Sequence, residues 1–293
     1  AEGKGIIIKV DNTIKALLRL ATYYRNKLNV KVVGVTGSTG KTSTKDLIAA
    51  LLSSKYKVFK TKGNFNSEIG LPLMTLELTS DIDVAVLEMG MSDLGEIEVL
   101  ARVATPDIAA ITNIGLSHME HLKTQENILK AKMEITTCFN ENNILVINAE
   151  DKMLKNISQK GYKLKKIGYN HEYDVYASNI ILREEETEFL AHVGNKEAVF
   201  TLKMAGKHNV LNTMIAIEVA NNLNVSLEEM IKGLENLEAT SMRLQLIKKD
   251  GFTIINDCYN ASPDSMKSSL DVLSAYKNNR RIAILGDMYE LGT

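Results

Sequence analysis

A glycine-rich stretch near the start of the chain holds the residues best suited to chemistry. It runs from Val33 to Thr44, reads V-G-V-T-G-S-T-G-K-T-S-T, and lies between an apolar strand-like run and a helix-like pattern. Such a turn directs backbone N–H groups and the positive end of a helix dipole at one point, which suits a phosphate group. Lys41 supplies a charge for the outer phosphates, and the Thr42 hydroxyl suits Mg²⁺. The stretch predicts a phosphate-binding loop, and its expected nucleotide contacts are Thr36, Gly37, Ser38, Thr39, Gly40, Lys41, Thr42 and Ser43.

The loop departs from the strict G-x-x-x-x-G-K-[ST] pattern at its first position. Val35 stands where that pattern has glycine, and Gly34 comes one place early, so the loop reads T-G-x-x-G-K-T. An ordinary glycine-rich turn between a strand and a helix is the alternative interpretation. Lys41 and Thr42 follow the last glycine in the required order, which favours phosphate binding.

Further polar residues follow other apolar runs. Glu88 ends the second strand-like run, and its carboxylate suits a Mg²⁺ ion beside Thr42. His118 follows the third run, and its imidazole suits a second metal ion. Lys132 lies on the next helical pattern. The structural alternatives are a solvated carboxylate, a histidine that binds no ligand, and a lysine on a solvated helix face.

Strand-like runs alternate with helical patterns through the first half of the chain. This alternation predicts an α/β fold with a mainly parallel sheet flanked by helices, and ligands in such folds bind beyond the carboxyl ends of the strands. The expected strands are 30–35, 84–87, 108–111 and 144–147, and the expected helices are 42–52, 95–103 and 128–139.

The pattern changes after Asp174. Three runs predict a small antiparallel sheet, at 175–182, 188–193 and 199–204. A long helix is expected at 209–223, and Ser226 and Glu229 form a capping box that opens another. Two later runs, with a helix between them, predict a right-handed βαβ unit that starts a Rossmann-like domain, at 252–256, 264–276 and 281–285.

These patterns divide the chain into three expected parts. Residues 1–27 are predicted to be a linker or remnant of a missing N-terminal domain, and 28–240 a central ATP-binding domain. Residues 241–293 are predicted to be the first, βαβ part of a truncated C-terminal domain. A single βαβ unit has too little core to stand alone, so the chain is expected to be a fragment.

The composition excludes several classes of protein. The formal net charge of −1 disfavours a nucleic-acid or membrane-surface binder. No apolar run reaches the roughly 18 residues of a membrane helix. The two cysteines do not make a disulfide framework, which favours a reducing cytoplasm. We expect a cytoplasmic enzyme, a monomer, with no nucleic-acid or membrane partner.

Taken in order, four features resemble the central domain of the Mur ligases: T-G-x-x-G-K-T-S, Glu88, N-I-G-x-x-H ending at His118, and A-K-x-E-I around Lys132. The likeness runs from about Leu17 to Thr293. Mur ligases are ATP-dependent enzymes that add amino acids or peptides to the bacterial cell-wall precursor. Within this family, three segments resemble the member that adds D-alanyl-D-alanine: 63–72, 257–266 and 286–292.

The resemblance implies a role for each matching residue. Thr42 and Glu88 would hold one Mg²⁺ ion and His118 a second, while Lys132 would carry a carbamate that is also a metal ligand. The catalytic residues would be Lys41, His118 and Lys132. The adenine, phosphate and ribose contacts would be Asn209, Arg243 and Asp257, and the substrate contacts Asn64, Asn66 and Asn113.

The resemblance also implies a reaction, the ATP-dependent joining of D-Ala-D-Ala to UDP-MurNAc-tripeptide through an acyl phosphate. One alternative is another Mur-type ligase or a folylpolyglutamate synthetase-like ligase. A nucleotide-switch GTPase is a second alternative, because Asn148 and Asp151 follow a predicted strand. Ala149 stands where a guanine-reading N-K-x-D motif needs lysine, which disfavours that alternative.

Overall fold

A mixed sheet forms the centre of the computed structural model, which describes residues 7–237, 242–278 and 280–291. Its strands lie in the order β2-β3-β1-β4-β5-β6-β7-β8-β9. Neighbouring strands are parallel from β2 to β7, and β7, β8 and β9 are antiparallel. The bounds are β1 Lys31–Thr36, β2 Val58–Lys60, β3 Val84–Glu88, β4 Ile108–Ile111, β5 Ile144–Asn148, β6 Lys163–Gly168, β7 Val175–Leu182, β8 Thr187–Val193 and β9 Lys196–Leu202.

The α/β class and the strands expected before residue 205 are confirmed. The antiparallel strands continue the parallel sheet, because β6 pairs with β7 at Ile167 and Val175. The helices are α1 Thr13–Arg25, α2 Lys41–Leu52, α3 Gly70–Leu76, α4 Glu96–Ala104, α5 Met119–Leu122, α6 Gln125–Met133, α7 Lys207–Asn222, α8 Leu227–Leu234 and α9 Pro263–Ser274, with short 3₁₀ turns at Glu134–Thr136 and Leu154–Asn156. Within the described residues, no helix has the length and apolar character needed to cross a membrane.

Each face of the sheet is covered by its own apolar core, as the alternation along β1 requires. Val33 and Val35 pack into the core that contains α2, α7 and α8, while Val32 packs into the core beside α4 and α6. Successive side chains of a strand point to opposite faces, so a run buried at every position needs helices on both sides. The turn at the end of β1 is therefore held from two sides.

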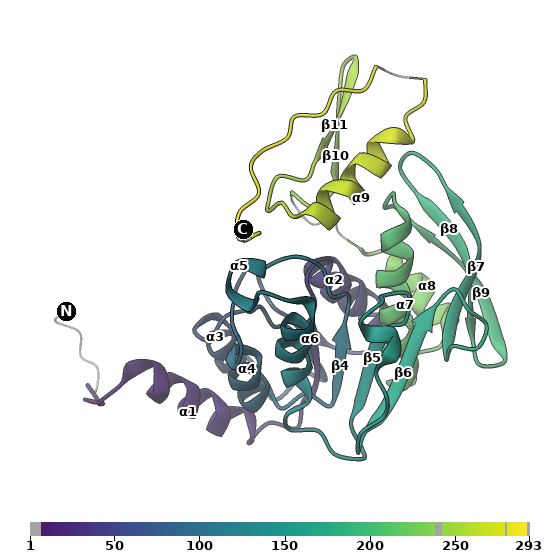
Figure 1. Cartoon of the computed structure of the whole chain (residues 1–293). Coiled ribbons are helices and arrows are strands. Elements are labelled where there is room, and N and C mark those ends of the chain that lie inside the picture. The colour runs from purple at the N-terminus through teal and green to yellow at the C-terminus, as the bar shows by residue number, and fades with distance from the viewer. Residues whose placement is uncertain (1–6, 238–241, 279, 292–293) are drawn as a thin grey trace.

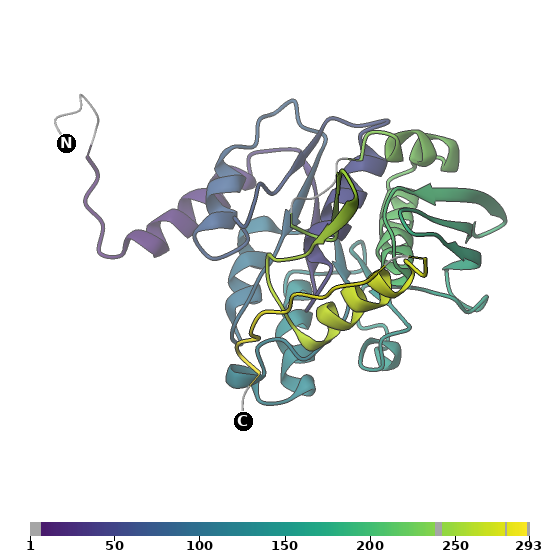
Figure 2. The ribbon, with the colours of Figure 1, turned by 90° about the horizontal axis from the view of Figure 1, so that it is seen from above.

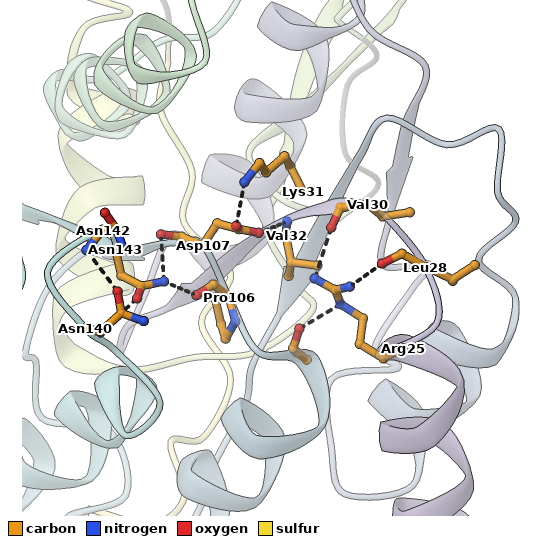
Figure 3. A network of polar contacts seen from close by, with 11 residues as sticks. Arg25, Leu28, Val30, Lys31, Val32, Pro106, Asp107, Asn140, Asn142 and Asn143 are labelled. Carbon is orange, nitrogen blue, oxygen red and sulfur yellow. Dashed lines mark hydrogen bonds and ion pairs between the residues drawn. The ribbon is translucent and has the colours of Figure 1, made fainter.

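The amino end of the sheet is tied to α1 through Arg25 (Figure 3). Its guanidinium donates hydrogen bonds to the carbonyl oxygens of Ala104 at 3.0 Å, Val30 at 3.0 Å and Leu28 at 3.2 Å. Asp107 completes this network by accepting a hydrogen bond from Val32 N at 2.9 Å. Residues 13–25, expected in a linker, thus form a helix fixed to the central sheet, and α1 also packs against α3 and α4.

The C-terminal region lies over the carboxyl ends of the parallel strands and is yellow-green to yellow in Figures 1 and 2. It contains a hairpin of β10 Gln245–Lys249 and β11 Phe252–Asn256, followed by α9. The predicted boundary between residues 240 and 241 falls on residues that lie outside the described part.

The prediction that residues 252–256 and 281–285 form the two strands of a βαβ unit is wrong. The described partner of β11 is the antiparallel strand β10, and 281–285 is not a strand. Ile284 is 95% exposed. An apolar β-branched run becomes a strand only when another backbone accepts and donates its hydrogen bonds, and no such ladder reaches 281–285 within the described residues.

Candidate active site

Two glycines allow the turn between β1 and α2 to take its shape. Gly37 has φ of 151°, and a Cβ there would lie 1.8 Å from Thr112 Oγ1. Gly40, the residue before α2, has φ of 77°, and a Cβ there would lie 3.0 Å from Asn212 Oδ1. Only glycine fits both the space and the left-handed conformation without strain. The start of α2 is therefore open to a ligand that its backbone N–H groups can bind.

Lys41 folds back over this turn. Its ammonium donates to the carbonyl oxygens of Gly37 at 2.8 Å and Ser38 at 3.3 Å. Burial lowers its pKa, Glu88 raises that pKa, and Arg243 lowers it. A phosphate oxygen could replace the two carbonyls as the acceptor, so the position of Lys41 is compatible with a phosphate ligand.

The segment after β4 is hydrogen-bonded to the turn. Asn113 Oδ1 accepts from Thr39 N at 3.0 Å, and Asn113 Nδ2 donates to Thr39 Oγ1 at 2.9 Å. Ser38 Oγ accepts from Gly115 N at 2.9 Å. Asn113, expected at the substrate, is thus engaged in holding the turn. Thr36 is also engaged, because its buried hydroxyl donates to Met89 O at 2.9 Å.

Glu88 lies at the end of β3, and only one of its two carboxylate oxygens is hydrogen-bonded. Oε1 accepts from Asn66 Nδ2 at 2.8 Å, whereas buried Oε2 has no hydrogen-bond partner among the described residues. A buried carboxylate oxygen without a partner is unfavourable unless a cation or donor reaches it. Asn66 therefore lies at this site, while the Asn64 side chain is exposed.

Lys132, from α6, is the largest fully buried side chain of the site, with 1% exposure. No described residue accepts a hydrogen bond from its amine. Burial, and then the nearby charge of Lys41, lower its pKa well below the usual lysine value. Burial also lowers the pKa of His118, while Glu290 raises it and Lys132 and Lys41 lower it. Lys41, Glu88, His118 and Lys132 are therefore close enough to interact electrostatically.

These residues fit a divalent cation. The unpartnered oxygen of Glu88 and the Thr42 hydroxyl are the hard oxygen donors that Mg²⁺ prefers. Among the described residues, no three His, Cys, Asp or Glu side chains gather to make a metal site. A cation at Glu88 would thus need ligands of other kinds, and a hydroxyl, an imidazole and a modified lysine would be such ligands.

A pocket separates this turn from the C-terminal region. Thr42, Ser43 and Asn209 line one side of it, and Arg243 and Asp257 line the other. The Arg243 guanidinium carbon lies 4.0 Å from the centre of the Tyr259 ring. Asp257 accepts from Leu244 N at 3.1 Å and from the Ser269 hydroxyl. The pocket brings together the residues expected at the nucleotide, although they come from distant parts of the chain.

The start of α7 differs from expectation. The helix was expected to begin at Asn209, but Gly206 is the N-cap and Asn209 lies inside the first turn. Asn209 Nδ2 donates to Ala205 O at 2.8 Å. His208, which the sequence analysis missed, also lines the pocket, and burial lowers its pKa. Its position directly before Asn209 was the signal that could have identified it.

Two family models match the chain. One, described as the Mur ligase middle domain, matches residues 35–220, and another, described as Mur ligase, glutamate ligase domain, matches residues 242–293. The UDP-N-acetylmuramoyl-tripeptide–D-alanyl-D-alanine ligase of Bacillus subtilis is 44% identical over 288 residues, which cover 98% of this chain and 62% of that protein. The chain thus spans less than two thirds of this curated relative.

Solved structures are similar over nearly the whole chain. A crystal structure of MurF from Acinetobacter baumannii has a TM-score of 0.92 and 34% identity, covering 97% of this chain and 63% of that one. The crystal structure of MurF ligase from Thermotoga maritima in complex with ADP has a TM-score of 0.89 and 32% identity, covering 99% of this chain and 68% of that one.

Proposed function

This chain belongs to the Mur ligase family, and from that premise we propose that it carries the ATP-binding centre of a ligase that joins D-Ala-D-Ala to UDP-MurNAc-tripeptide. The single observation that carries the proposal is the group of half-buried Lys41 and buried Glu88 and Lys132 beside the glycine turn. A turn that binds phosphates, next to an unpartnered carboxylate oxygen, suits a metal-bound nucleotide. The relative from B. subtilis bears the name of this reaction.

The proposed reaction has two steps. The tripeptide carboxylate attacks the γ-phosphate, which gives an acyl phosphate and releases ADP. The amine of D-Ala-D-Ala then attacks the acyl carbon, phosphate leaves, and the amine loses a proton. Lys41 and Arg243 offset the repulsion between a carboxylate and a triphosphate, so catalysis is mainly positioning and electrostatics. Mg²⁺, when bound, supplies further positive charge to the phosphate oxygens.

We propose that Lys132 becomes a carbamate and that two Mg²⁺ ions bind, with Thr42 and Glu88 at one and His118 at the other. The lowered pKa supports this, because it favours the neutral amine, which attacks CO₂ and then loses a proton. The product is an anionic group near the positive charge of Lys41, in place of a neutral amine. Carbon-13 NMR of protein equilibrated with ¹³C-bicarbonate should show one carbamate signal that Lys132→Met removes. A wild type without this signal would contradict the modification.

The next features concern the compartment and the oligomeric state of the protein. Cys138 and Cys258 are free thiols, which is compatible with a reducing cytoplasm. We propose a cytoplasmic monomer whose partners are its small-molecule substrates. Light scattering on the purified full-length protein should give the mass of one chain, and a larger mass at micromolar concentration would contradict the monomer.

ADP release by the full-length protein tests the reaction. It should require both UDP-MurNAc-tripeptide and D-Ala-D-Ala, and it should be supported by ATP and not by GTP. The panel should include the single amino acids that other Mur-type ligases add, and a folate with glutamate. Turnover with one of those substrates in place of D-Ala-D-Ala would assign the chain to a different ligase, and ADP release without any acceptor would contradict the ligase.

A further inference from the structure

The C-terminal region contacts the candidate metal-binding histidine directly. Glu290 Oε2 lies 2.5 Å from His118 Nδ1, which is an ion-pair distance without hydrogen-bond geometry, and buried Nδ1 has no hydrogen-bond partner among the described residues. The backbone carbonyl of the same residue accepts a hydrogen bond from Glu120 N at 3.1 Å. In both overall views the yellow chain runs down to α5, which begins directly after His118 (Figures 1 and 2). Glu290 therefore engages this segment through its side chain and its backbone.

A second contact supports the same docking. Asp264, in the first turn of α9, accepts a hydrogen bond from Leu116 N at 3.3 Å. Its Oδ2 would lie 2.4 Å from a Cβ placed on Gly115. Two separated residues of the C-terminal region thus contact residues 115–120. The same segment also bonds to Ser38, so it connects the C-terminal region to the phosphate-binding turn.

His118 is held in an unusual conformation at this junction. Its φ is 64°, in the left-handed region that few residues other than glycine adopt. Its side chain is 20% exposed, whereas that of Glu290 is 44% exposed. A neutral imidazole has one N–H donor and one acceptor nitrogen, and a carboxylate beside one nitrogen selects the tautomer in which that nitrogen carries the proton.

We propose that Glu290 is a positioning residue for His118. It holds the imidazole with the proton on Nδ1 and leaves Nε2 unprotonated, available as a metal ligand. This inference rests on the proposed function, because it gives His118 a metal to bind. A carboxylate that accepts from the second nitrogen of a ligating histidine fixes its ring and raises its basicity. Because Glu290 belongs to the C-terminal region, this ligand is in place only when that region is docked.

Tautomer and metal affinity test the role in the full-length protein. Nitrogen-15 NMR of histidine-labelled protein reports which His118 nitrogen carries the proton, and electron paramagnetic resonance reports Mn²⁺ binding beside a non-hydrolysable ATP analogue. Glu290→Ala should abolish the preference for Nδ1–H and weaken Mn²⁺ binding about 10- to 100-fold. Glu290→Gln keeps an acceptor oxygen, so its Nδ1–H preference and Mn²⁺ affinity should lie between those of the wild type and Glu290→Ala. Tyr289→Phe is the matched control, since Tyr289 is 80% exposed, and should change neither readout.

Each outcome bears on the proposal. A Glu290→Ala protein that keeps the Nδ1–H tautomer and the wild-type Mn²⁺ affinity would overturn it. Because Glu290 is partly exposed, the variants should fold, and circular dichroism would confirm this. A full-length wild type that releases no ADP with its proposed substrates, yet shows the expected tautomer and Mn²⁺ pattern, would contradict the ligase reaction and support the positioning role. If the wild type releases ADP as expected while Glu290→Ala keeps the wild-type tautomer and Mn²⁺ affinity, the result would support the ligase reaction and contradict the positioning role.

Discussion

The two ends of the same parallel strands both bury charge, but only one end satisfies it. At the amino end, the Arg25 guanidinium donates to three carbonyl oxygens, and Asp107 accepts from a backbone N–H (Figure 3). At the carboxyl end, Glu88 Oε2 and His118 Nδ1 are buried without a hydrogen-bond partner among the described residues, and burial lowers the pKa of Lys132 well below its usual value. Satisfied buried groups contribute to stability, whereas unsatisfied ones cost stability and are compensated when a charged ligand binds.

The largest effect should come from the carboxyl end and should be on activity. Lys132→Met removes a charged group fixed at the reaction centre, so ADP release by the full-length protein should fall about 10²- to 10³-fold. The free energy of unfolding without ligand should not fall, because the substitution removes a buried amine that is costly to charge. Lys130→Met, an exposed lysine on the same helix, is the control for steady-state kinetics and urea denaturation. Equal turnover in both variants would remove Lys132 from the site.

The amino end should respond in the opposite way. Arg25→Met leaves two buried carbonyl oxygens and one partly buried carbonyl oxygen without their donor. Each buried group left unpaired costs about 1–3 kcal/mol, so we expect a loss of about 3 kcal/mol in the free energy of unfolding. The affinity for an ATP analogue should stay unchanged. Urea denaturation and analogue titration measure the two quantities, with Arg19→Met, an exposed residue of the same helix, as the control. A weakened analogue affinity at full stability would refute the division between the two ends.

The pH dependence of stability sharpens the comparison for Lys132. Its pKa in the folded protein is lowered from 10.5, so between the two pKa values the unfolded chain binds more protons than the folded one. Stability from this group therefore rises with pH across that window and is lost as the pH falls, by at most about 1.4 kcal/mol per pH unit. Without metal and CO₂, the unfolding free energy of the wild type should rise relative to that of Lys132→Met as the pH increases toward 10.5. A flat difference would mean that the buried amine is not destabilised.

The sequence predicts the parallel sheet and the glycine turn after β1 because their signals are local. The run Val33 to Val35 is buried on both faces, and Gly37 and Gly40 mark the left-handed turn that follows. Lys132 was predicted from the family resemblance, and its burial depends on packing that no local pattern contains.

The contacts that join distant segments could not be predicted in the same way. The strand expected at 281–285 needs a neighbouring backbone, and β10, with polar residues at both ends of its run, carries little apolar signal. Arg25 looks like any charged residue in a helix until α1 packs on the sheet. Glu290 acquires its contact with His118 only through the docking of the C-terminal region. These residues are defined by tertiary structure.

The smallest effect should come from the exposed part of the amino-end network. Lys31 Nζ lies 2.9 Å from Asp107 Oδ1, but the lysine side chain is 63% exposed. Water and salt screen such a pair, so Lys31→Ala should lower the free energy of unfolding by about 0.2–1 kcal/mol, and less at high salt. Asp107 would keep its hydrogen bond from Val32 N, which is the buried part of its role. If urea denaturation showed a loss as large as that of Arg25→Met, the stability of this end would lie in its surface charges and not in its buried hydrogen bonds.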